Sequence, residues 1–418
     1  GRLVRAGGGR DTVELYHDLV RAVVLRELAP AARAFHHRTL AEALAAAPDP
    51  DPDELVLHFH GAGDLPRAGE WALRAAARAA AALAFARAAE LYARALAWGT
   101  YPAAQVLEIS LARADALVHA GRCGEAAPLY LGAAALTRDR LQELALRRRA
   151  AEQYLVSGHV ESGLALLAPL ARELGLPFPA GTAPTIARFG LEVVQLAVAR
   201  RLPRRDRGLT PLDRLRLDTC WSAGKGLGFI DPTRAAVFSN HGMRLALRAG
   251  DPRGIARADA YIALMNVNKA DPARAAAGRR TIDEARATAD RLADPHLAGL
   301  TTILGGVAAM NHGEWSRTLR LVEEGAARLR AANVTDDTWE RGISHSMALH
   351  SLLMLGDFPA LHARADRMHR DAEDAGDRFA AVVAILYVAH ATLAAGDPDG
   401  ARGHVRRALS MWTYDRFS

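Results

Sequence analysis

One short string in this sequence has the residue types of a phosphate-binding site. Residues 224–228 read Gly-Lys-Gly-Leu-Gly. A phosphate-binding P-loop needs a further glycine five residues before the glycine of its Gly-Lys pair, and a serine or threonine after the lysine to bind magnesium. Thr219 and Gly226 occupy those two positions here. The string therefore predicts the end of a helix, or a kink in one, rather than a nucleotide site.

Histidines occur in close pairs that are worth testing as metal ligands. The pairs are His36–His37, His58–His60 and His362–His369. Adjacent residues, and residues two apart, point in different directions on a helix, so they do not bind one metal together. The third pair supplies one imidazole per two helical turns, and no carboxylate converges on it. We expect no metal site, and for the adjacent His17 and Asp18 we expect a helix-surface or packing role.

Signatures of catalysis are missing from the sequence. It contains no HExxH, no GxSxG, no kinase loop motif and no Walker pair. Cys123 and Cys220 are far apart and have no second ligand nearby, which favours neither a disulfide nor a zinc site and suits a reducing cytoplasm. We predict no catalytic, cofactor-binding or metal-binding residue in this chain and leave open whether it belongs to an enzyme.

Arginine clusters are the remaining candidates for a binding role. One cluster is Arg147–Arg149, and for it we expect a solvated helix face. The other lies in a segment that interrupts the repeats described below, where binding residues tend to concentrate. Its candidate partner contacts are Arg200, Arg201, Arg204, Arg205 and Arg207. The net charge of +6 is too small for this length to imply nucleic acid, although salt-sensitive DNA binding by this cluster stays the alternative.

The composition indicates which elements position these residues. Half of the 418 residues are apolar, 24% are charged and only 6% are aromatic. Alanine, leucine and arginine, which lose little rotamer freedom in a helix, recur throughout. Alternating runs of β-branched residues are nearly absent. We predict an all-α protein.

A repeated turn predicts the arrangement of those helices. It consists of small residues, a glycine and a polar residue before a new helix, at Gly63, Gly121, Gly158, Gly250, Gly313, Gly356 and Gly396. A glycine in the left-handed conformation caps one helix, and an acidic residue after it can cap the next. Gly121 and Gly158 are 37 residues apart, and Gly356 and Gly396 are 40 apart. We expect a further, weaker turn near Leu83.

This period is close to that of tetratricopeptide-type helical hairpins. One-sided apolar stripes follow the turns, as in Trp315, Leu319, Val322, Ala326 and Leu329. We predict a tetratricopeptide-like α-solenoid of stacked helical hairpins, with a short winged-helix-like remnant at the N-terminus. Such an array presents a concave face that binds a protein, a peptide or a small effector.

We expect five parts along the chain. Residues 1–47, with helices at 12–28 and 31–46, end a winged-helix-like segment that follows a missing nucleotide-binding module. Residues 48–53 are a linker, 54–174 a first repeat block, 175–211 an insertion with a basic loop, and 212–418 a second block, truncated at the C-terminus. The most apolar helix candidate, 189–199, is too short to span a membrane.

Several strings resemble known families. DTVELYHDLVR (11–21) and LVLHFH (55–60) are similar to the junction at which large bacterial signal-transduction ATPases, of the AAA or STAND type, run into tetratricopeptide repeats. CWSAGKGLGFID (220–231) and LALRAG (245–250) resemble the C-terminal half of multidomain bacterial serine/threonine protein kinases that carry such an ATPase. The repeat region of large LuxR-type transcription regulators is a related alternative.

The resemblance implies a non-catalytic, cytoplasmic sensor or scaffold segment. It would bind an effector and regulate the ATPase and kinase modules of a larger protein, with its own nucleotide-binding module as a partner. ATP and magnesium would bind in those modules, N-terminal to Gly1, so none of the family's catalytic residues falls on this sequence.

Overall fold

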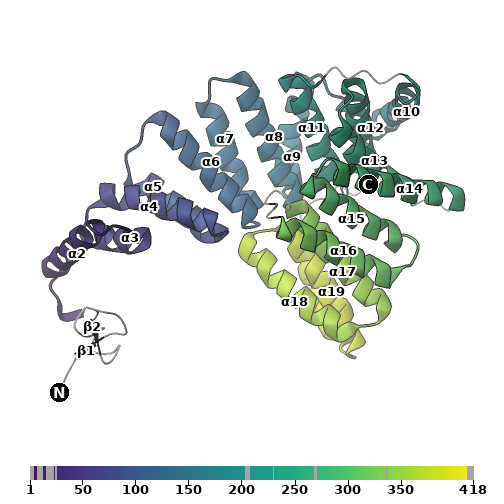
Figure 1. Cartoon of the computed structure of the whole chain (residues 1–418). Coiled ribbons are helices and arrows are strands. Elements are labelled where there is room, and N and C mark those ends of the chain that lie inside the picture. The colour runs from purple at the N-terminus through teal and green to yellow at the C-terminus, as the bar shows by residue number, and fades with distance from the viewer. Residues whose placement is uncertain are drawn as a thin grey trace. The chain divides into compact units, whose positions relative to one another are not determined.

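The computed structural model describes residues 4–6, 13–15, 23, 26–202, 208–228, 230–267, 271–332, 334 and 338–411. This part of the chain is almost entirely helical, which confirms the all-α class (Figure 1). The exception is an antiparallel pair of three-residue strands, β1 (Val4–Ala6) and β2 (Val13–Leu15). Val4 pairs with Leu15, and Ala6 pairs with Val13.

The strand pair corrects the helix predicted at residues 12–28 at residues 13–15, whereas residues 23, 26 and 27 are helical. The Val-Glu-Leu sequence of β2 alternates apolar and polar residues, and this alternation suits pairing with the Val-Arg-Ala of β1. The second predicted helix is confirmed as α2 (Pro30–Ala45). His17 and Asp18 lie outside the described residues, and the winged-helix-like nature of the segment stays a prediction.

The chain divides into two compact units, Gly1–Ala116 and Leu117–Ser418. The first contains α2, α3 (Pro52–Gly61), α4 (Leu65–Ala81) and α5 (Phe85–Trp98), and α6 (Ala103–His119) crosses the division. Each of α2 to α5 packs on the next. The five domain boundaries expected from the sequence stay predictions.

The second unit is a tetratricopeptide-like array of helical hairpins. One helix of each hairpin packs on its counterpart in a neighbouring hairpin, as α8 does on α11, α15 on α17 and α17 on α19. Its helices are α7 (Cys123–Leu136), α8 (Arg140–Val156), α9 (Val160–Glu173), α10 (Thr182–Ala199), α11 (Pro211–Leu227), α12 (Pro232–Ala249), α13 (Pro252–Val267), α14 (Pro272–Arg291), α15 (Pro295–Met310), α16 (Trp315–Ala331), α17 (Thr338–Leu355), α18 (Phe358–Ala375), α19 (Arg378–Ala394) and α20 (Pro398–Met411).

The turns between hairpins have the expected conformation. All seven turn glycines have positive φ angles, between 71° and 88°. The side chain of Asp357 caps α18 by accepting a hydrogen bond from the backbone N–H of Ala360, and Asp397 caps α20 in the same way. The turn expected near Leu83 is confirmed, since Leu83 takes the left-handed position with φ 60°.

Within the second unit the last hairpins return to the first ones. The Thr338 hydroxyl at the start of α17 donates a hydrogen bond to the Val118 carbonyl at 3.2 Å. A Cβ atom on Gly158, in the turn before α9, would lie 3.1 Å from the backbone nitrogen of Phe379 in α19. The array therefore closes on itself, and the turn at Gly158 has little room for a side chain.

The glycine-rich string at 224–228 ends α11, as expected. A Cβ atom on Gly226 would lie 2.6 Å from the Cβ of Leu155 in α8. Gly224 offers its carbonyl to the Tyr261 hydroxyl of α13, which donates a hydrogen bond at 2.9 Å. The glycines thus allow α8 and α13 to approach α11 closely.

Replacing Gly226 by alanine should lower the free energy of unfolding by about 1–3 kcal/mol, because the Leu155 Cβ is fixed to its helix and the helices must move apart. Gly190, in α10, is the matched control, since a Cβ there meets nothing within 4 Å. Gly190→Ala should raise the free energy of unfolding by about 0.5–1 kcal/mol, because alanine favours the helix interior over glycine. Urea denaturation of both variants measures the difference, and equal effects would contradict the packing role.

Candidate binding groove

Helix α10 is held on the array by a buried carboxylate. Glu192 has no exposed surface. It accepts hydrogen bonds from Arg188 at 2.5 Å and from His241 of α12 at 3.0 Å, and Arg244 Nε lies 3.0 Å from its other oxygen. Because α10 contributes the carboxylate and α12 contributes His241 and the cation Arg244, this cluster joins the two helices, which lie side by side in Figure 1.

The environment of Glu192 keeps its carboxylate ionised. Burial alone would raise its pKa, but the hydrogen bond and charge of His241 and the guanidinium groups of Arg188 and Arg244 lower it further than burial raises it. The net pKa is lowered from the ordinary value of a glutamate. The anchor of α10 is therefore electrostatic at neutral pH.

An apolar contact completes the attachment of α10. Leu196 lies one turn after Glu192 and is 7% exposed. It packs in one cluster with Leu217 of α11 and with Met243, Ala246 and Leu247 of α12. Other apolar side chains of α10, including Ile186 and Val194, remain exposed. The helix thus buries one face and leaves another available.

A groove of about 710 Å³ lies between α10, α12, α13 and α14. Its volume is within the range of about 300–1,000 Å³ that is typical of small-molecule sites. Most of its wall is apolar and comes from Phe189, Val193, Ala197, Ala236, Ile262 and Ala277. The described part of the insertion predicted at 175–211 therefore supplies one wall of this groove.

Few polar groups face the groove. Arg200, at the end of α10, forms an ion pair with Asp259 of α13, with 2.5 Å between Nη2 and Oδ1. Arg274 of α14 is exposed and lies 3.4 Å from Asp271. Asn240 of α12 is only 6% exposed, and its amide has no hydrogen-bonding partner among the described residues.

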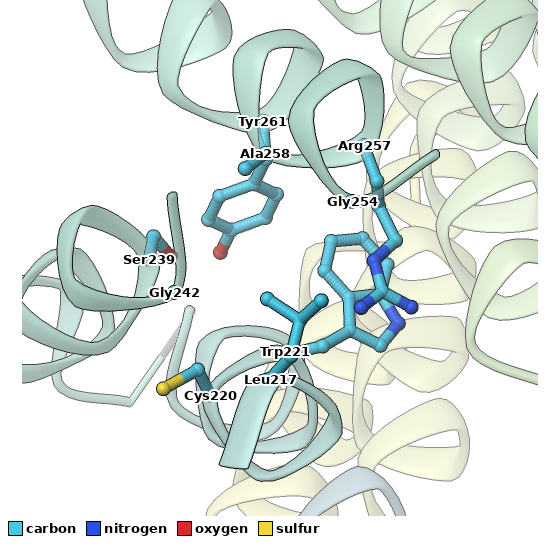
Figure 2. A pocket seen from close by; sticks show the side chains of 9 residues that line it. All are labelled: Leu217, Cys220, Trp221, Ser239, Gly242, Gly254, Arg257, Ala258 and Tyr261. Carbon is cyan, nitrogen blue, oxygen red and sulfur yellow. The ribbon is translucent and has the colours of Figure 1, made fainter. Parts of the chain in front are cut away.

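A second cavity, between α11, α12 and α13, is too small for an organic ligand. Its volume is about 20 Å³, which is the space of one water molecule. Figure 2 shows Trp221 of α11 beside Arg257 of α13, whose guanidinium carbon lies 4.7 Å from the ring centroid. Burial raises the pKa of Tyr261, which also lines this cavity, to about 12. These side chains fill the space between the helices and stabilise their packing.

Buried charged side chains join helices of different hairpins. Lys225 of α11 and Glu152 of α8 form a buried ion pair at 2.5 Å. Glu340 of α17 is fully buried and bonds to His296 of α15 at 2.9 Å. These buried pairs join α8 to α11 and α15 to α17.

The arginines singled out in the sequence have different surroundings. Arg200 lines the groove, and Arg201 is exposed at the end of α10. Arg204, Arg205 and Arg207 lie outside the described residues. The other cluster is engaged inside the chain, because Arg147 contacts Glu173, Arg148 contacts Glu152, and Arg149 contacts the Tyr130 hydroxyl.

The histidine pairs point in different directions, as expected. His58 approaches His37 with 2.9 Å between the Nδ1 atoms, while His60 lies against Trp98. The contact between His37 and His58 joins α2 to α3, and no sequence spacing revealed it. His362 is exposed, and His369 is buried. The described residues contain no group of three or more His, Cys, Asp or Glu that could hold a metal ion.

Both cysteines are free and buried in the described structure. Burial raises the pKa of the Cys123 thiol to about 12 and raises that of Cys220 as well. Neither thiol is a reactive nucleophile at neutral pH. None of the helices in the described ranges is both long enough and apolar enough to cross a membrane.

Comparisons with known proteins add little beyond the fold. No family model matches the chain, and no curated protein matches it. One similar solved structure is a Rap protein complexed with competence and sporulation factor, with 10% identity, a TM-score of 0.49, and coverage of 91% of this chain and 97% of that one.

Another similar structure is a signal-transduction ATPase with numerous domains and a tetratricopeptide repeat sensor, from Pyrococcus horikoshii. The identity is 12% and the TM-score 0.34, and the match covers 98% of this chain and 56% of that one. Likenesses this distant carry no argument about function, so the functional case depends on the groove.

Proposed function

We propose that this chain is a non-catalytic binding module whose effector occupies the groove between α10 and α14. The groove itself carries this proposal, because it combines a largely apolar wall with one ion pair and one buried, unpartnered amide. This combination is typical of ligand sites, in which a few polar groups orient a mostly apolar ligand.

The module regulates a larger bacterial signalling protein by changing its conformation. The resemblance at residues 11–21, 55–60 and 220–231 supports a parent that carries an ATPase module and a serine/threonine kinase domain. A parent of the LuxR type would use the same groove. In either case the effector must bind one conformation more tightly than another, since only differential affinity shifts a conformational equilibrium.

Ala277→Trp tests the groove as the binding site. Ala277 is exposed and lines the groove from α14, so an indole there should block it without disturbing the core. A ligand present at 100 times its Kd should stabilise the wild-type chain by about 2.7 kcal/mol, and this gain should be lost in the variant. Thermal unfolding with a panel of defined small amphiphiles and synthetic peptides measures it.

Ala287→Trp is the matched control. Ala287 is exposed on the same helix, and the groove does not include it. A ligand that stabilises the wild type and Ala287→Trp, but not Ala277→Trp, supports the proposal. Ligands that stabilise all three proteins equally would bind elsewhere, and the groove would lose its assigned role.

A further inference from the structure

Four hydroxyl-bearing residues line the groove, and three of them, all except Thr233, donate hydrogen bonds inside the chain. Ser239 donates a hydrogen bond to the Ala235 carbonyl at 2.9 Å, and Thr281 donates to the Ala277 carbonyl at 3.1 Å. Tyr261 donates to Gly224. An extended peptide would bury several backbone amides here without partners, and each would cost free energy. The groove therefore suits an occupant with few polar atoms.

The volume of the groove also favours a small molecule over a docked helix. A ten-residue α-helix, about 15 Å long and 10 Å across, fills roughly 1,200 Å³. The groove, which is open to solvent, has a volume of about 710 Å³. A helix would leave much of its own surface outside, whereas a small molecule would have a larger share of its surface covered.

The polar groups that line the groove indicate the head group of this occupant. Arg200 and Arg274 bring two cations, and Asp259 brings one anion. Asn240 holds an amide that has no partner in the described structure and that can donate two hydrogen bonds. Arg200 is paired with Asp259 and Arg274 with Asp271, so the charges at the groove balance, and a ligand group that replaces Asp259 beside Arg200 must itself be negative. These donors suit a ligand carboxylate, which only accepts hydrogen bonds.

We propose that the groove binds a small amphiphilic monocarboxylate, a molecule with one carboxylate on an otherwise hydrocarbon body. This inference rests on the proposed function and specifies its ligand. The carboxylate competes with Asp259 for Arg200 and accepts from the Asn240 amide. The hydrocarbon part lies along the apolar wall that includes Val193, Ala236 and Ala277.

Decanoate and 1-decanol are the probes, because they have the same chain length and differ in the charge of the head group. Calorimetric titration of the 418-residue chain below micellar concentrations should give a Kd for decanoate at least about tenfold lower than for decanol, as expected for a charge-assisted hydrogen bond. Arg200→Gln should weaken decanoate about tenfold and leave decanol unchanged. Arg201→Gln is the control, since Arg201 is exposed and does not line the groove.

Two further variants separate the ligand site from a structural role. Asp259→Asn should strengthen decanoate binding, because it removes both the competing anion and its repulsion. Asn240→Leu should weaken decanoate while preserving or raising the melting temperature, because no hydrogen bond of the folded chain is lost. If the Arg200–Asp259 pair had only a structural role, Arg200→Gln and Asp259→Asn would change the affinity for decanoate in the same direction.

The outcomes distinguish this inference from the proposed function. Equal affinities for decanoate and decanol, or an unchanged affinity in Asp259→Asn, would overturn the carboxylate while leaving the groove as a site for neutral amphiphiles. A different outcome is that neither probe binds, and that a peptide binds to the wild type but not to Ala277→Trp. This outcome would overturn the inference and support the proposed function. Decanoate binding that Ala277→Trp does not affect would overturn both.

Discussion

Replacing Lys225 by methionine should lower the free energy of unfolding by about 3–5 kcal/mol, because the change leaves a buried carboxylate without its closest cation. Lys225 and Glu152 are only 6% and 9% exposed in their side chains, and 2.5 Å separates Nζ from Oε1. Arg148 and Ser222 each contact the other oxygen of Glu152 at 2.7 Å. Burial raises the pKa of Glu152, and the charges of Lys225 and Arg148 more than reverse this, so the carboxylate is ionised in the folded chain.

A double-mutant cycle of Lys225→Met and Glu152→Gln, followed by urea denaturation, measures the coupling. The double variant should recover part of the loss, because it removes the unpaired charge. Arg402→Met is the control, since Arg402 and Asp399 form an ion pair with 66% and 85% exposed side chains, and its loss should cost less than about 1 kcal/mol. A cost for Lys225→Met no greater than that of the control would show that the buried pair is replaceable.

Most of the fold could be predicted from the sequence, because its signals are local. A turn glycine such as Gly356, the capping Asp357 that follows it and the apolar stripe of the next helix all lie within about twenty residues. A turn was predicted near Leu83 although no glycine lies there, since the period of the hairpins required a turn at that point. The helix predicted at 12–28 was wrong at residues 13–15 for the opposite reason, because β2 depends on its pairing with β1.

The groove was only partly predictable. The interruption of the repeats marked residues 175–211 as a place where binding residues concentrate, and Arg200 was among its candidates. Asn240 could not be found in this way, because a single polar residue on an apolar helix has no motif. Buried contacts such as that of Ser222 with Glu152, 70 residues apart, depend on how the hairpins stack, and no local pattern encodes that.

Replacing Glu192 by glutamine should detach α10 and lower the free energy of unfolding by about 3 kcal/mol or more. It removes the anion that Arg188 and Arg244 share and to which His241 is hydrogen-bonded, and it leaves Arg244, 9% exposed in its side chain, next to Arg188 without a counter-charge. Because α10 forms one wall of the groove, Glu192→Gln should also lower the affinity for any ligand whose binding is blocked by Ala277→Trp. A loss of stability without a loss of groove binding would show that α10 does not shape the site.

The same anchor predicts how stability depends on pH. The pKa of Glu192 is lower in the folded chain than the ordinary value of about 4.3 that it has when unfolded, so its contribution is fully present above that value. The contribution is lost as the pH falls through the folded pKa. Unfolding measured from pH 7 to pH 3 should therefore show a constant gap between the wild type and Glu192→Gln down to about pH 5, and a shrinking gap below it. A gap that persists at the acid end would mean that the carboxylate does not hold α10 by its charge, and the helix would then depend on the packing of Leu196 and on the Arg200–Asp259 ion pair.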